Sequence, residues 1–233
     1  MRFVAITRMK ARLLGRVARA IMAGMILMGM SGLPAGACYT GLAFIPTADM
    51  VENGMYCMEL QYDDTFARGN EQTRILNAEL GLTARFEAGV DYDFSNGAET
   101  RALLNAKYLA VSEGDRNPAI AVGICNVGRH LKSSPYAVAT KDLRVVRGHL
   151  GVAGIVGNSQ WFAGMDKAVT SRLTLMADYT SGDDNNSSLG FSYQSNDRFG
   201  ITSGVAFPND GGDMQFTIHF VLGGTYRHIG KRC

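Results

Sequence analysis

Apolar and polar residues alternate with a period of two along most of the chain after residue 54. In GMYCMELQY (54–62), Tyr, Met and Leu side chains occupy one phase, and Cys, Glu and Gln occupy the other. The same alternation recurs in RFEAGVDYDF (85–94), SRLTLMADYT (171–180) and DMQFTIHFVL (213–222). Successive side chains of a β-strand point to opposite faces, so the pattern predicts strands with one apolar and one polar face.

Turn-forming residues separate these runs at short intervals, as in Ser95-Asn96-Gly97, Gly182–Asn186 and Pro208–Gly212. The intervals predict about twelve strands, most of roughly 8–11 residues, which is a length that suits tilted membrane-spanning strands. After the N-terminal region no helical period is found in the sequence. The fold class is therefore all-β and antiparallel.

The N-terminal region has the pattern of an export signal. Residues 1–19 carry six basic residues and no acidic one, 20–30 is an apolar run, and Ala35-Gly36-Ala37 supplies small residues. This predicts a signal peptide at 1–37, cleaved between Ala37 and Cys38. A cysteine at the first mature position also allows lipidation, although Ala35 stands where lipoproteins usually carry Leu.

Removal of the signal changes the charge of the protein. It takes away six of the 23 basic residues and none of the 21 acidic ones, which leaves a net charge near −4. The sequence therefore has no basic patch that would indicate binding to nucleic acid. The four cysteines, Cys38, Cys57, Cys125 and Cys233, show no metal-ligand spacing, so neither a metal nor a cofactor is expected. Cys57 and Cys125 share the polar phase, and both a disulfide and free thiols remain open.

Two architectures fit the alternation: a membrane barrel with its apolar face toward lipid, and a soluble sandwich with that face in its core. Small residues on the polar face favour a crowded barrel interior. Tyrosines near strand ends favour aromatic girdles at the two membrane interfaces. The small residues are Gly81, Gly89, Ala121, Gly123, Gly151, Gly190, Thr202 and Gly204, and the tyrosines are Tyr62, Tyr92, Tyr108, Tyr179 and Tyr193.

The polar faces of neighbouring predicted strands carry charges of both signs, which suits a lumen crossed by salt bridges. These residues are the candidates for any selectivity of the barrel. The set comprises Glu87, Asp91, Arg101, Lys107, Arg147, Arg172 and Asp178.

Two histidines, His149 and His219, fall on the polar phase. A third possibility is an enzyme in which one of them forms a Ser-His-Asp set with Asp178 and Ser188 or Ser192. The chain has no Gly-x-Ser-x-Gly motif. Interior, hydrogen-bonded histidines are therefore expected, with no catalytic residue and no enzymatic activity.

Three stretches carry a family resemblance: TGLAFIPTADMVENGMYCMELQY (40–62), GLTARFEAGVDYDF (81–94) and LLNAKYLAVSEGDRNPAIAVGICNVG (103–128). They resemble YjbH-like outer-membrane barrels, which are associated with exopolysaccharide production. The resemblance implies a compact, single-barrel version. The C-terminal HFVLGGTYRHIGKRC departs from the terminal aromatic on which many such barrels end.

The sequence thus predicts an antiparallel up-and-down transmembrane β-barrel of about twelve strands. Its parts are a signal peptide (1–37), an N-terminal plug or lid (38–53), the barrel (54–223) and a tail (224–233). The expected function is a narrow channel or a structural component of exopolysaccharide export in a Gram-negative-type outer membrane. Its partners would be outer-membrane lipid and polysaccharide or export proteins, with the barrel itself a monomer. The alternative is a soluble periplasmic or surface β-sandwich that binds a ligand, with a lipid anchor at Cys38 as a variant.

Overall fold

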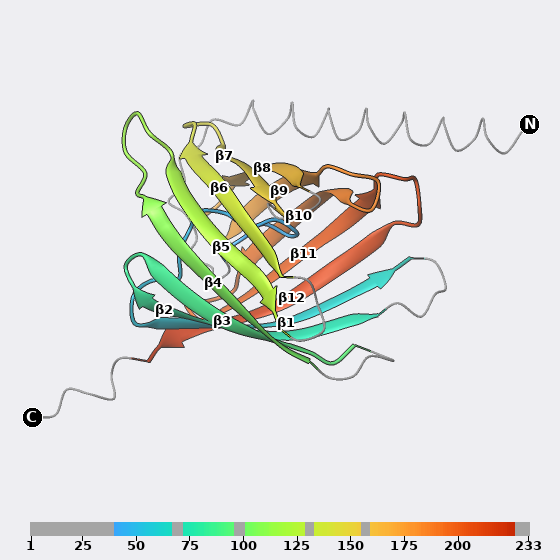
Figure 1. Cartoon of the computed structure of the whole chain (residues 1–233), viewed down its shortest axis with the longest axis horizontal. Helices are drawn as coiled ribbons and strands as arrows, with labels where there is room; N and C mark the ends of the chain where they lie inside the picture. Colours follow the sequence, from blue (N-terminus) through green and yellow to red (C-terminus); the bar gives the residue numbers. More distant parts are fainter. Residues whose placement is uncertain (1–39, 67–71, 96–100, 129–132, 155–158, 227–233) are drawn as a thin grey trace, which may run out of the picture.

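The computed structural model describes residues 40–66, 72–95, 101–128, 133–154 and 159–226, which form twelve strands (Figure 1). The predicted signal peptide, with Ala37 and Cys38, lies outside the described residues. The strands are β1 (Met55–Thr65), β2 (Thr73–Thr83), β3 (Phe86–Asp93), β4 (Arg101–Val111), β5 (Ala119–Val127), β6 (Ser134–Asp142), β7 (Arg147–Ala153), β8 (Gln160–Ala168), β9 (Leu173–Thr180), β10 (Asn186–Gln194), β11 (Phe199–Pro208) and β12 (Gln215–Thr225).

Every strand pairs antiparallel with its neighbours in chain order, and the sheet closes on itself. The closing pair joins β1 to β12 in continuous register, from Met55↔Thr225 to Thr65↔Gln215. A closed sheet leaves no unpaired strand edge, which an open sandwich cannot achieve. The predicted antiparallel barrel is confirmed, and the sandwich alternative is wrong.

The two ends of the barrel differ in the length of most of their connections. The end where β1 begins and β12 ends, here the turn end, has two residues between β2 and β3, four in each of 143–146, 169–172 and 195–198, and seven in 112–118. At the opposite loop end, every connection has five to seven residues. Outer-membrane barrels place their short turns on the periplasmic side and their longer loops outside.

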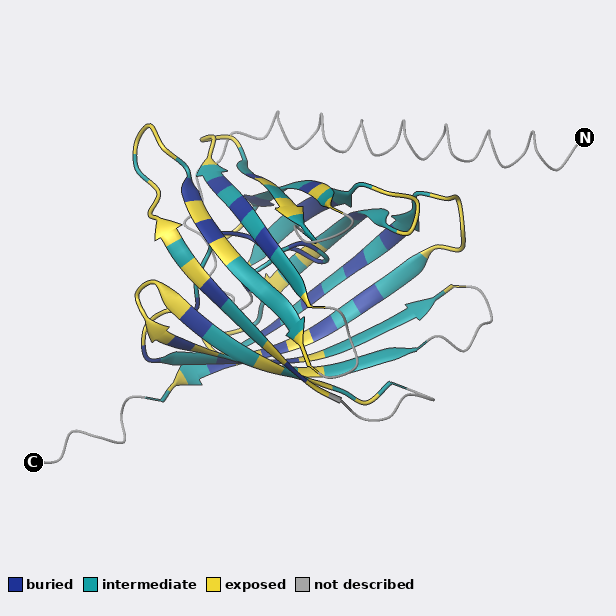
Figure 2. Ribbon diagram, in the orientation of Figure 1, coloured by how far each residue is buried: buried dark blue, intermediate teal, exposed yellow. Residues whose placement is uncertain are grey.

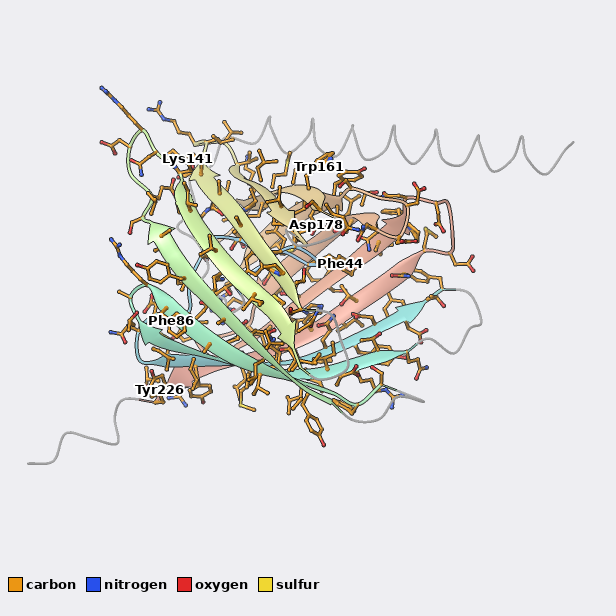
Figure 3. All side chains as sticks on the ribbon, in the orientation of Figure 1. Phe44, Phe86, Lys141, Trp161, Asp178 and Tyr226 are labelled. Atoms are coloured by element: carbon orange, nitrogen blue, oxygen red, sulfur yellow. The ribbon has the colours of Figure 1, made fainter. Side chains whose placement is uncertain are left out.

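The outer surface of the barrel is apolar. Phe86, Val90 and Phe220, which a sandwich would bury, are 36%, 37% and 44% exposed, whereas Glu87 beside Phe86 is only 4% exposed. Figure 2 shows buried and exposed residues alternating along several strands. Several aromatic side chains on this surface lie near strand ends, among them Trp161, labelled in Figure 3, which packs on Tyr179 at the loop end with 5.0 Å between ring centroids. Such a surface suits lipid contact with aromatic girdles. Within the described ranges, no helix is both long and apolar enough to cross a membrane.

Large rings and glycines share the inner face on adjacent strands. Gly123 pairs with Tyr136 and Gly151 pairs with Phe162. A Cβ atom built on either glycine would collide with the facing ring. Each ring therefore lies over the glycine of the neighbouring strand, as the predicted crowding of a small barrel requires.

Residues 40–53, here the inner segment, lie inside the barrel, where Figure 1 shows them as a blue trace enclosed by the strands. Gly54 joins the inner segment to β1 with a φ of 87°, a conformation that disfavours any side chain. Its N–H donates to Gly81 O at 2.8 Å, and its carbonyl accepts from Tyr226 N at 2.9 Å. Gly54 therefore fixes where the chain turns from the lumen into the wall.

The depth of a lipid-facing position should decide how well it tolerates charge. We expect Leu150→Arg, in the middle of β7, to lower the free energy of unfolding in lipid vesicles by about 2–4 kcal/mol. Leu143→Arg is the matched control, because Leu143 is similarly exposed, 57% against 62%, but lies in the turn 143–146. Urea titrations of both variants would measure the difference. Equal effects at the two depths would contradict a membrane-embedded surface.

Candidate functional site

The inner segment forms a compact turn inside the lumen. Leu42 N–H donates to Ile45 O at 2.8 Å, and Gly41 and Pro46 form an isolated antiparallel bridge. The Thr47 hydroxyl donates to Thr40 O at 3.1 Å. These local bonds satisfy the backbone of a segment that has no neighbouring strand, which the buried position of the segment requires.

A buried ion pair on β3 and β4 holds both arms of this turn. Lys107 Nζ lies 2.8 Å from Glu87 Oε1, and both side chains are 5% exposed or less. Glu87 also accepts from the Thr40 hydroxyl at 2.9 Å and from Val51 N–H at 2.6 Å, while Lys107 donates to Thr40 O at 3.3 Å. Two residues at opposite ends of the inner segment, Thr40 and Val51, therefore bind one carboxylate.

A hydrogen-bonded chain on β6, β7 and β8 holds the middle of the inner segment. Ala48 N–H donates to Thr140 Oγ1 at 2.9 Å, and Thr140 Oγ1 lies 2.9 Å from His149 Nδ1. His149 Nε2 lies 2.7 Å from Asp166 Oδ1. The His149 ring therefore joins Thr140 on β6 to Asp166 on β8, with the donor in each contact set by the tautomer of the ring.

The tip of the turn reaches the wall formed by β8, β9 and β11. Phe44 N–H donates to Asp178 Oδ2 at 3.4 Å, and Figure 3 shows the two residues close together inside the barrel. A Cβ atom on Gly164 of β8 would lie 2.6 Å from side-chain atoms of both Leu42 and Ile45. Glycine at this position therefore leaves the space that the apolar side chains of the tip occupy.

Apolar packing completes the contact between the inner segment and the wall. Leu42, Ala43, Ile45 and Ala48 form one buried cluster with wall residues. The wall residues of that cluster are Ala119, Ala121, Tyr136, Val138, Phe162 and Met176. The principal apolar core of the described chain thus lies inside the barrel and includes the segment that fills the lumen.

Nearer the loop end, a second polar chain joins β1 and β12. The Thr217 hydroxyl donates to Asp63 Oδ1 at 2.5 Å and lies 2.5 Å from His219 Nε2. His219 Nδ1 lies 2.9 Å from Glu59 Oε1. The His219 ring therefore links Thr217 on β12 to Glu59 on β1, with the donor in each contact set by the tautomer of the ring. The expectation of interior, hydrogen-bonded histidines is met by both His149 and His219.

Four of the predicted selectivity residues contact the inner segment. Glu87, Lys107 and Asp178 do so as described above, and Arg147 Nη2 lies 2.8 Å from Asp49 Oδ1 near the turn end. Asp91 lies apart from them in the lumen, where it accepts from Asn77 Nδ2 at 2.6 Å.

The remaining predicted positions have other outcomes. Arg172 does not line the lumen, because it lies in the turn 169–172 and is exposed. Arg101 begins β4, but its side chain lies outside the described part of the structure. Cys57 and Cys125 lie on β1 and β5, which are not adjacent strands, and they form no disulfide with each other. No Ser-His-Asp set forms with His149, whose ring nitrogens face Thr140 and Asp166.

Analysis of the sequence missed Thr40, Asp49, Thr140 and Asp166, which all bond to the predicted residues. Residues two positions apart in a strand share a face, so Thr140 lies on the face of Val138 and Asp166 on the face of Gly164. The sequence therefore already allowed both to be placed on the polar face. No local pattern indicates that Thr40 meets Glu87, since the contact spans 47 positions and depends on the path of the inner segment.

Comparisons with known proteins agree with this architecture. No protein-family model matches the chain, and no curated protein sequence matches it. Among the solved structures that match are "KdgM porin in complex with disordered oligogalacturonate" with a TM-score of 0.56, and a NanC porin with 0.53. Each of these two porins is 9% identical to this chain, and the matches cover 71% and 72% of this chain and 98% of each porin. The fold of this chain is therefore similar to that of these porins. Neither supports the narrower resemblance to YjbH-like proteins.

The buried pair should be much more sensitive to mutation than an exposed one. Lys107→Met leaves Glu87 buried without its cation, so we expect a loss of about 3–5 kcal/mol in the free energy of unfolding. Lys141→Met removes a comparable bond, 3.1 Å to Glu113, from side chains that are 27% and 28% exposed. That control should lose about 1 kcal/mol or less. A double variant, Lys107→Met with Glu87→Gln, should recover part of the loss in the same titration, and equal losses in both single variants would refute the role of the buried pair.

Proposed function

We propose that the protein is a narrow outer-membrane channel that the inner segment holds closed. The apolar outer surface with aromatic side chains near strand ends, the polar lumen and the porin-type fold support membrane insertion. The turn end would face the periplasm, so the inner segment enters the lumen from the periplasmic side. The closed sheet leaves no strand edge to pair with another chain, which suits a monomer.

One observation carries this proposal: the inner segment contacts wall strands all around the lumen. It bonds to β3 at Glu87, to β6 at Thr140 and to β9 at Asp178. These strands lie at well-separated positions around the closed sheet, so the segment crosses the lumen instead of lying along one side. A solute can pass only after this segment moves.

The bonds that hold the segment are suited to release as a unit. Its polar contacts with the wall are single hydrogen bonds, together with the ion pair between Asp49 and Arg147. Its apolar contacts come mainly from residues 42–48, with Val51 packed against Cys57 and Val221. The wall strands keep their own ladder of hydrogen bonds without it, because each strand is paired on both sides. The barrel therefore does not depend on the segment for its backbone pairing.

A narrower assignment, to the export of envelope polysaccharide, is part of the proposal. Its support is the resemblance of 40–62, 81–94 and 103–128 to YjbH-like proteins. The first of these stretches includes the whole inner segment, so the resemblance covers the closing element as well as the strands beside it.

Conductance in planar bilayers tests the closed state. Leu42→Ser with Ile45→Ser removes the largest apolar contacts of the inner segment, and we expect channel openings that are rare in the unaltered protein. Ala43→Cys with Gly204→Cys should then close the channel again under oxidising conditions. Ala43 Cβ lies 3.3 Å from a Cβ built on Gly204, near the separation of about 3.5–4.5 Å in disulfides. Reduction should restore the openings.

The controls separate opening from misfolding. All variants are made with the natural cysteines replaced by serine, and a heat-dependent gel shift verifies the closed barrel. Leu150→Ser makes the same chemical change on the lipid-facing side and should leave conductance at the background level. The proposal would be overturned if the folded Leu42→Ser/Ile45→Ser barrel carried no current. It would also be overturned if the channel openings were the same with the introduced disulfide formed and reduced, in the variant with Ala43→Cys and Gly204→Cys.

A further inference from the structure

We propose that the wall beneath the inner segment is a binding site for a neutral or amino-bearing saccharide, which takes the place of the segment when the channel opens. This inference rests on the proposed channel function and names its substrate class. Three features of the wall carry it: its hydrogen-bond acceptors, its two lumen-facing rings and its net charge.

The wall accepts hydrogen bonds where the inner segment supplies donors. Glu87 accepts from a hydroxyl and a backbone N–H, Thr140 accepts from a backbone N–H, and so does Asp178. A molecule that replaces the segment must bring donors to the same positions, because a buried carboxylate without partners is unstable. Hydroxyl and ammonium groups meet that demand at Glu87, Thr140 and Asp178, whereas carboxylate or sulfate groups do not. At the turn end, by contrast, Arg147 binds the Asp49 carboxylate of the segment.

The part of the wall that lies across the lumen from Glu87 also presents flat apolar surface, beside Thr140 and Asp178. Tyr136 on β6 and Phe162 on β8 lie over Gly123 and Gly151, so each ring lies along the wall instead of across the lumen. Both rings belong to the apolar cluster that contacts the inner segment, and they are 7% and 1% exposed. A pyranose ring has an apolar C–H face and a rim of hydroxyls. It therefore fits with its C–H face on these rings and its hydroxyls toward the acceptors beside them and toward Glu87 across the lumen.

Charge in the lumen excludes the opposite class of saccharide. The described lumen side chains that hydrogen-bond or form ion pairs include six carboxylates against two permanent cations, Lys107 and Arg147. These carboxylates are Glu59, Asp63, Glu87, Asp91, Asp166 and Asp178. In a narrow, low-dielectric lumen an excess of negative charge attracts cations and repels polyanions. The KdgM porin structure is a complex with oligogalacturonate, an acidic saccharide. Despite its similar fold, this chain would select against such a ligand.

Blocking of single channels tests the assignment on the full chain with Leu42→Ser and Ile45→Ser. Three oligomers of equal length serve as probes: glucosamine (cationic), N-acetylglucosamine (neutral) and galacturonate (anionic). We expect the first two to interrupt the current, with the cationic oligomer effective at the lowest concentration. The anionic oligomer should need a concentration at least roughly tenfold higher, since it must enter against the lumenal charge.

Two variants assign the effect to named residues. Phe162→Leu keeps an apolar side chain but removes the ring, and should raise the half-blocking concentration of both the cationic and the neutral oligomer by roughly fivefold. Asp91→Asn removes one lumenal charge without touching the inner segment, and should weaken only the cationic oligomer. Leu150→Ser, on the lipid side, should change neither value.

The outcomes distinguish the two proposals. If the folded variant carries no current, the channel function itself is wrong. If it conducts but the galacturonate oligomer blocks as well as the glucosamine oligomer, or if none of the three blocks, the channel stands and the saccharide assignment is wrong. If neither Phe162→Leu nor Asp91→Asn changes the half-blocking concentrations, the proposed site is likewise wrong.

Discussion

The ion pair between Lys107 and Glu87 is the interaction on which the interior depends. Two opposite charges buried side by side are stable only when their remaining hydrogen-bonding capacity is satisfied. Here the inner segment supplies those partners, through the Thr40 hydroxyl and carbonyl and the Val51 N–H. The buried ion pair of the wall therefore depends on the segment for hydrogen-bond partners, and the segment depends on the same pair for its position. The same pair sits within the turn-end half of β3 and β4, so it also fixes how deeply the segment enters the lumen.

The other contacts follow from this placement. Once Thr40 and Val51 are fixed at one carboxylate, the chain between them has to cross the lumen and return. It does so as a tight turn whose apolar side chains face β5 to β9 and whose free N–H groups meet Thr140 and Asp178. The small residues of the wall receive this turn. Gly164 leaves space for Leu42 and Ile45, and Gly204 lies against Ala43. A barrel interior with larger residues at these positions would have no room for a peptide segment.

Strand phase predicted the fold class, the strand number and the side of the wall on which Glu87, Lys107 and Asp178 lie, because a period of two is a local property that tertiary contacts do not change. It failed at Arg172, where the strand begins one residue later and the side chain falls in a turn. It could not decide the fate of Cys57 and Cys125, since phase gives a face but not the neighbour of a strand. Strand phase could not predict the contacts of the inner segment for the same reason, since Phe44 contacts Asp178 across 134 positions of the sequence.

The closing pair of β1 and β12 has a consequence for how the protein assembles. Met55 and Thr225 come together from opposite ends of the strand sequence, so this ladder closes the longest loop in the molecule and carries the largest entropic penalty. The inner segment directly precedes β1, and most of its partners lie on β3 to β9, away from this closing pair. A sheet that is still open between β1 and β12 can therefore gather around the segment before the closing ladder forms. Closure at this ladder as the last step would spare the protein from threading a peptide into a finished ring.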